Sequence, residues 1–88
     1  MDTEAIKAMI KTNVHHIVAG RTVPLHKHAD SDEVFYCIAG EGFGVLEDRD
    51  VRLEVGQTFI VPAGTMHALK TDSEIYVCAF QIPKVVES

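Results

Sequence analysis

The feature that most constrains this chain is a pair of histidines two residues apart, His26 and His28, in a β-prone segment. On a β-strand, residues i and i+2 point to the same face, so two imidazoles could bind one ion. Residues 29–32, between His28 and Glu33, are small and polar and predict a turn. Such a turn would bring the Glu33 carboxylate back toward both histidines. The predicted ligand set is therefore a mixture of nitrogen and oxygen.

A third histidine, His67, follows a Pro-x-Gly turn at the end of a second β-prone segment. We interpret His67 as the fourth ligand, brought in from a distant pair of strands. Three neutral imidazoles and one carboxylate suit a divalent transition ion, namely Fe, Mn, Ni, Zn, Co or Cu, because Mg and Ca prefer oxygen ligands alone. An octahedral ion held by four protein groups keeps two positions for water, substrate or dioxygen.

These two segments resemble the motifs of the cupins, a family of small metal-binding β-barrels. The first motif requires Gly, His-x-His, Glu and Gly at fixed spacing, and it is met by Gly20, His26, His28, Glu33 and Gly40. The second requires Gly, Pro-x-Gly, His and Asn, and it is met by Gly56, Pro62, Gly64 and His67, with Thr71 in place of Asn. The resemblance implies an all-β jelly-roll barrel with a metal site. It implies no single activity, because cupins host many unrelated reactions.

The rest of the sequence predicts the same class of fold. Many short β-prone segments alternate with turn signals, which is typical of a sandwich or barrel. A short helix is predicted over residues 2–11, capped by Asp2 or Thr3. We therefore expect one domain of 88 residues, with an N-terminal helical segment over residues 1–12 and a β-barrel over residues 13–83. The glycine cluster at residues 40–44 is predicted to be a turn with a close approach between strands.

Strand alternation also predicts which side chains line a pocket. Glu33 must face inward to reach a metal, so Phe35 and Cys37 should face inward as well. Met66 and Phe80 are predicted to join them as substrate-binding residues, and Phe43 is a further candidate. This lining favours a small, largely apolar or aromatic ligand that chelates the metal. The opposite face of residues 33–39 is apolar and predicts a homodimer.

The sequence leaves three classes of function open. The first is a metal-dependent enzyme, most plausibly an oxygenase such as a dioxygenase, with an isomerase or decarboxylase next. The second is a non-catalytic module that binds or senses a small molecule around a structural metal, and a metal-stabilised partner of another protein is a lesser third. No catalytic residue is identified. His15 and His16 are adjacent and face opposite sides of a regular strand, and a surface or structural role is the simpler interpretation for both.

Composition and charge argue against several other classes of protein. The net charge is −5 and the Lys and Arg residues are scattered, so no nucleic-acid binding is expected. The sequence has no apolar run of about 18 residues, so no membrane span is expected. The first residues lack the basic start and apolar run of a signal peptide, so a cytoplasmic protein is expected. The only two cysteines, Cys37 and Cys78, are expected to stay reduced.

Overall fold

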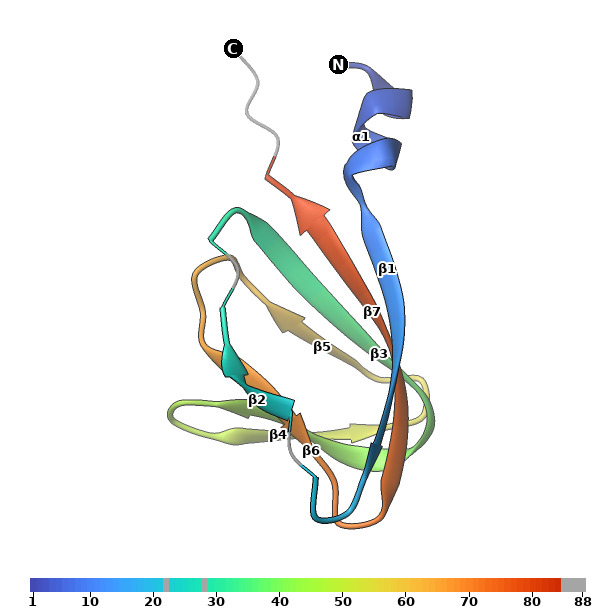
Figure 1. Ribbon diagram of the computed structural model, residues 1–88, viewed down its shortest axis with the longest axis vertical. Coiled ribbons are helices and arrows are strands. Elements are labelled where there is room, and N and C mark those ends of the chain that lie inside the picture. The colour runs from blue at the N-terminus through green and yellow to red at the C-terminus, as the bar shows by residue number, and fades with distance from the viewer. Residues whose placement is uncertain (22, 28, 85–88) are drawn as a thin grey trace.

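The computed structural model describes residues 1–21, 23–27 and 29–84, and for residues 23–26 it describes the backbone only. Short strands dominate the described chain (Figure 1). Its elements are α1 (Thr3–Met9), β1 (Lys11–Val18), β2 (Val23–His26), β3 (Ser31–Leu46), β4 (Asp50–Glu54), β5 (Thr58–Val61), β6 (His67–Lys70) and β7 (Glu74–Pro83). The predicted all-β class with a short N-terminal helix is confirmed.

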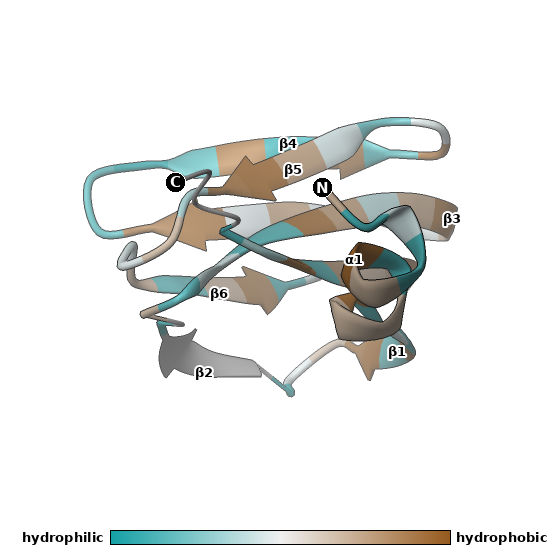
Figure 2. Cartoon of the chain, turned by 90° about the horizontal axis from the view of Figure 1, so that it is seen from above, coloured by the Kyte–Doolittle hydropathy of each residue, from teal (hydrophilic) through white to brown (hydrophobic). Residues whose placement is uncertain are grey.

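The long strand β3 belongs to both layers of the molecule. Its first half pairs with β7 on one side and β5 on the other, and β1 extends that layer beyond β7. Its second half pairs with β4 and β6, and β2 extends the other layer beyond β6. The two layers pack as a jelly roll around one apolar core (Figure 2). The strand order ends at β1 and at β2, so hydrogen bonds between the described strands do not close the sheet.

The glycine cluster at residues 40–44 lies inside β3, so the prediction of a turn there is wrong. The predicted close approach between strands is found, since a methyl group on Gly40 or Gly42 would overlap the backbone of a neighbouring strand. In place of a turn, β3 bends, and a bulge between Cys37 and Ala39 shifts its pairing with β7. The extra residue reverses which positions face inward, so Gly42 and Gly44 are buried. Phe43 therefore faces outward, contrary to expectation, and the Nζ of Lys70 lies 5.6 Å from the centre of its ring.

Gly44 makes room for the side chain that fills the centre of the core. A methyl group at this position would overlap the ring of Phe59, which is itself buried. The Phe59 ring lies 6.0 Å from the ring of Phe35, measured between centroids. The glycine is thus required by the close approach of an aromatic ring and not by an unusual backbone angle.

The N-terminal helix is shorter than the sequence predicted. Asp2 caps it as expected, since its Oδ1 accepts hydrogen bonds from the backbone N–H groups of Glu4 and Ala5. The helix ends at Met9, however, and Lys11 and Thr12 belong to β1, where they pair with Gln81 and Phe80. No residue of α1 is buried.

Within the described residues, no helix has the length and apolar character that crossing a membrane requires. The cytoplasmic location stays a prediction.

The contact between Gly44 and Phe59 gives a first prediction. Gly44→Ala should lower the free energy of unfolding by about 1–3 kcal/mol, measured by urea denaturation, because the added methyl group overpacks the core. In a Phe59→Ala background the same substitution should cost less, since the ring that it meets is gone. Equal costs in both backgrounds would show that Gly44 is required for another reason.

Candidate metal centre

Glu33 and His67 meet in the interior of the molecule although 34 residues separate them. Glu33 lies near the start of β3, between Val61 of β5 and Gln81 of β7. His67 begins β6 in the other layer, where it pairs with Leu46 near the end of β3. The Nε2 atom of His67 lies 2.8 Å from Oε1 of Glu33. Glu33 is 4 % exposed and His67 is 1 % exposed, so water contributes little to solvating either group.

The backbone of the preceding turn fixes the protonation of the His67 ring. Nδ1 of His67 lies 2.9 Å from the carbonyl oxygen of Thr65, which can only accept a hydrogen bond, so Nδ1 carries the proton. In a neutral ring, Nε2 then has a lone pair directed at Glu33, whose ionised carboxylate is also an acceptor. Two acceptors this close require a proton or a cation between them. The Thr65 carbonyl had no sequence signal beyond its position in the turn before His67.

The geometry of this pair fits two ligands of one metal ion. Nitrogen and oxygen ligands bind transition ions at roughly 2.0–2.2 Å, so adjacent donors in an octahedral shell lie about 3 Å apart. The observed separation of 2.8 Å is close to that value. A carbonyl that holds the second ring nitrogen of a histidine is also the usual support for a metal ligand. Glu33 and His67 could therefore hold a metal together.

The other two predicted ligands are placed only in part. His28 lies outside the described residues, and for His26 only the backbone is described. The backbone of His26 is in register with that of His67 across the β2–β6 pair. Among the described residues, no group of three or more His, Cys, Asp and Glu side chains is arranged to hold a metal ion. The complete four-residue ligand set therefore stays a prediction.

The predicted pocket residues are distributed between different parts of the fold. Phe35 is buried and its ring centroid lies 5.7 Å from that of His67, so it covers the candidate centre. Cys37 faces the same way but lies deeper, with its Sγ 3.7 Å from the carbonyl oxygens of Ala39 and Gly40. Phe80 pairs with Val34, on the outer face of the layer, so the structure does not bring it to Glu33.

Met66 lines an open groove that reaches the turn before His67. The groove has a volume of about 750 Å³, and its wall includes Thr65, whose carbonyl oxygen holds His67. Leu46, Ile60 and Met66 are apolar parts of its lining. Charged side chains from residues 47–49 and from Lys27 also line it. A small molecule with both apolar and charged parts would fit such a surface.

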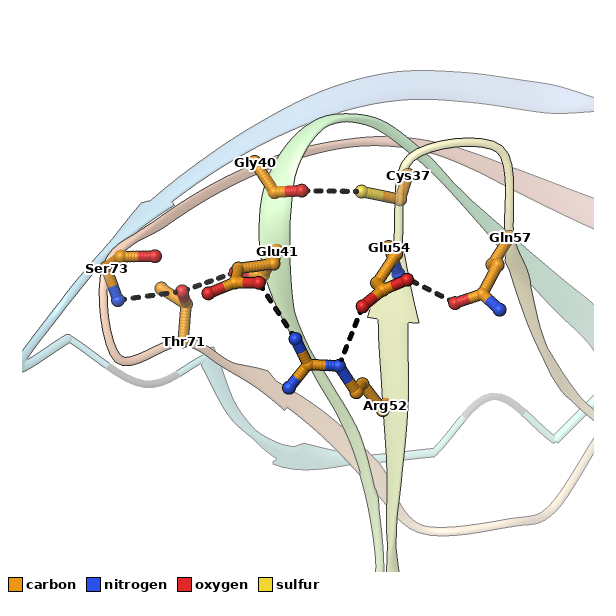
Figure 3. A network of polar contacts seen from close by, with 8 residues as sticks. All are labelled: Cys37, Gly40, Glu41, Arg52, Glu54, Gln57, Thr71 and Ser73. Atoms are coloured by element: carbon orange, nitrogen blue, oxygen red, sulfur yellow. Dashed lines mark hydrogen bonds and ion pairs between the residues drawn. The ribbon is translucent and has the colours of Figure 1, made fainter.

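Three other polar residues, Asp32, Thr71 and His16, form contacts outside the candidate centre. Asp32 accepts a hydrogen bond from the backbone N–H of Ala63 at 2.7 Å, which ties the start of β3 to the Pro62–Gly64 turn. Thr71, which replaces the expected Asn, donates to the carbonyl oxygen of Glu41 at 2.6 Å and accepts from the N–H of Ser73 (Figure 3). His16 is exposed, lies 2.7 Å from Glu74 and stacks on Tyr76. Its neighbour His15 is half-buried, on the face shared with Ile17.

Comparison with known proteins defines the class of this chain. The family model described as Cupin domain matches residues 13–81, most of the chain. The chain therefore belongs to the cupin family, as the motifs indicated.

Two relatives named as acireductone dioxygenases match part of the chain. Acireductone dioxygenase 2 of Arabidopsis thaliana is 34 % identical over 62 residues, which cover 65 % of this chain and 32 % of that protein. The acireductone dioxygenase of Tuber melanosporum is 35 % identical over 63 residues, which cover 65 % of this chain and 36 % of that protein. This chain thus spans about a third of the length of these relatives.

Solved structures share the fold across nearly the whole chain. A protein from Thermotoga maritima described as a predicted oxalate decarboxylase matches with a TM-score of 0.81 and 23 % identity, over 96 % of this chain and 76 % of that one. A DMSP lyase from Ruegeria pomeroyi matches with a TM-score of 0.77 and 25 % identity, over 90 % of this chain and 41 % of that one. At such identities we take the likeness as evidence of the fold alone.

Two His–Glu pairs, Glu33–His67 and His16–Glu74, have nearly equal nitrogen–oxygen distances but differ in burial, so they test how burial affects stability. Without bound metal, His67→Ala should lower the free energy of unfolding by about 3 kcal/mol or more, because it removes one partner of a buried charged pair. His16→Ala breaks the exposed pair with Glu74 and should cost less than about 1 kcal/mol. Urea denaturation of chelator-treated protein measures both. Equal losses would contradict the burial of the Glu33–His67 pair.

The position of Cys37 predicts how the two thiols react. Burial raises the pKa of the Cys37 thiol above its usual range, so at pH 8 it forms less of the reactive thiolate. A thiol-specific chromogenic reagent should modify Cys78, which is half-buried, well before Cys37. Both should react after unfolding in guanidinium, and Cys78→Ser should leave the native protein nearly unreactive. Rapid modification of Cys37 in the folded protein would place it in an open pocket instead.

Proposed function

We propose that this cupin binds a divalent transition metal through His26, His28, Glu33 and His67 and uses it to act on a small molecule as an oxygenase. The observation that carries the proposal is the buried Glu33–His67 contact, in which a ring nitrogen and a carboxylate oxygen, both of them groups that bind transition metals, lie 2.8 Å apart. The register of the His26 backbone with His67 supports the larger set. The partial similarity to acireductone dioxygenases favours a dioxygenase among the possible activities.

Each described residue has a distinct task in this proposal. A bound transition ion would supply Lewis-acid or redox chemistry. The Thr65 carbonyl holds the proton of Nδ1 and keeps Nε2 of His67 available as a donor atom. Glu33 provides the negative charge that offsets the charge of the cation. Phe35 covers the pair with an apolar ring, which excludes water and strengthens the electrostatic interactions there.

A non-catalytic binding or sensing module with a structural metal is the alternative. It is favoured by the apolar residues nearest the pair, Phe35, Val61 and Leu46, none of which can transfer a proton. Turnover of any small molecule that depends on the metal would exclude this alternative.

Metal content tests the proposal directly. Elemental analysis of the purified, untagged protein should give about one transition ion per chain, and Glu33→Gln should weaken metal binding by more than about 10-fold because the amide lacks the carboxylate's charge. Glu74→Gln changes the carboxylate of the exposed His16 pair and should leave the metal content unaltered. Equal metal content in all three proteins would contradict the proposed ligand set.

An oxygen electrode tests the catalytic part. We expect the metal-loaded protein to consume oxygen with small enediols, thiols or enols, and Glu33→Gln to lose that consumption together with the metal. Metal binding without any turnover would leave the binding or sensing module as the function.

We also propose that two copies form a homodimer through the outer face of the β1–β7–β3–β5 layer. Val34, Tyr36 and Ile60 lie on this face, and Tyr36 and Ile60 are exposed. A second copy suits this apolar face, because burying its exposed apolar side chains on both chains offsets the repulsion between two chains of net charge −5.

Sedimentation analysis of one substitution tests the dimer. Ile60→Lys should shift the protein to monomer, since it places a charge in the apolar contact. Val55→Lys changes a residue that is equally exposed (63 % against 62 % for Ile60) but lies at the turn after β4, and it should leave the dimer intact. A wild-type protein that is monomeric at all concentrations would overturn the proposal.

A further inference from the structure

The inner face of the β1–β7–β3 layer changes from apolar to polar at the level of Glu33. Deeper in the molecule this face is formed by buried apolar residues, namely Ile17, Val77, Ile75 and Ala79. The next inward position on β7 after Ala79 is Gln81, which is half-buried. On β1, the inward positions on the far side of His15 are Asn13 and Lys11, and both are exposed. The polar residues therefore lie where solvent or a small molecule can reach them.

Strand register aligns these polar residues with the candidate metal centre. Gln81 is directly opposite Glu33 on β3, and Lys11 is directly opposite Gln81 on β1. The three strands lie side by side in the order β3, β7, β1 (Figure 1). Neighbouring strands are about 4.8 Å apart, so Glu33 and Lys11 stand about 10 Å apart on one face. We call Glu33, Gln81 and Lys11 the polar row.

The outer two members of the polar row are available to a ligand. Within the part of the chain that the structure describes, the side chains of Lys11 and Gln81 form no hydrogen bond or ion pair with another residue. Lys11 supplies an ammonium group and Gln81 a carboxamide, which together can donate to the two oxygens of a carboxylate. A phosphate would need more positive charge and more donors than this pair offers.

We propose that Lys11 and Gln81 bind the carboxylate of a small organic acid whose other end reaches the metal at Glu33 and His67. This inference rests on the proposed metal site and specifies its substrate class. It replaces the largely apolar or aromatic ligand expected from the sequence. Lys11 and Gln81 determine specificity in this arrangement and take no part in the chemistry.

Paired chelating acids test the proposal with the full-length, metal-loaded protein. Succinic and glutaric monohydroxamates carry a chelating group at one end and a carboxylate at the other. Butanohydroxamic and pentanohydroxamic acids have the same lengths with a methyl group instead. In at least one pair, isothermal titration calorimetry should give about 10-fold tighter binding of the acid that carries the carboxylate, because that carboxylate accepts charge-assisted hydrogen bonds.

Substitutions assign that preference to the polar row. Lys11→Met should reduce the preference for the carboxylate-bearing acid over the methyl-ended acid to about twofold or less. Binding of the methyl-ended acid and the metal content should stay unchanged. Lys11→Arg should retain most of the preference, and Gln81→Leu should weaken it. Lys7→Met removes the same charge from α1 and should leave the preference intact.

The outcomes separate this inference from the proposed function. If the wild-type protein binds metal and both members of each pair equally, the inference is wrong and the metal site stands. The inference is also wrong if Lys7→Met abolishes the preference as fully as Lys11→Met, since net charge would then explain it. If the protein holds no metal, both proposals fail.

Discussion

A carboxylate and an imidazole that face each other in the dry interior of a small β-fold are the constraint on which this structure depends. Burying either group without a compensating charge is costly. The Thr65 carbonyl accepts from Nδ1 of His67, and Nε2 meets the Glu33 carboxylate at 2.8 Å, where a shared proton or cation offsets that cost. A side-chain pair held in this way is poised to share a cation, and the surrounding apolar residues increase the strength of that interaction.

The fold brings the pair together through one long strand. Glu33 near the beginning of β3 lies in one layer, and Leu46 near its end pairs with His67 in the other. The bend between them depends on the bulge after Cys37 and on glycines that approach neighbouring strands and the Phe59 ring closely. Thr71, the residue that departs from the family motif, then ties the turn between β6 and β7 back to the bend at Glu41. The geometry of the centre is thus determined by strands and tight turns, which hold side chains more rigidly than long loops.

The sequence predicted the class of fold and the meeting of Glu33 with His67, because both depend on local turn chemistry and on fixed spacing within the motifs. It also predicted that Phe35 faces inward, since strand alternation from Glu33 is regular up to Cys37. Alternation failed beyond that point, because a bulge leaves no clear local signal and reverses the direction of Phe43. The sequence also could not determine which side of the sheet Phe80 faces, since residues 75–80 are apolar on both sides of the strand. Lys11 was assigned to the helix because its pairing with Gln81 is a contact across 70 residues, which local propensity does not contain.

Membership in the cupin family and the partial similarity to acireductone dioxygenases agree with a metal-dependent role, and the buried Glu33–His67 pair gives that role a physical basis in this chain. Anomalous X-ray diffraction from crystals of the metal-loaded protein, collected at the absorption edge of the bound metal, tests the account most directly. The account predicts one strong peak within about 2.3 Å of both Oε1 of Glu33 and Nε2 of His67. A peak elsewhere, or a Glu33–His67 pair that stays in direct contact with no metal beside it, would contradict the account.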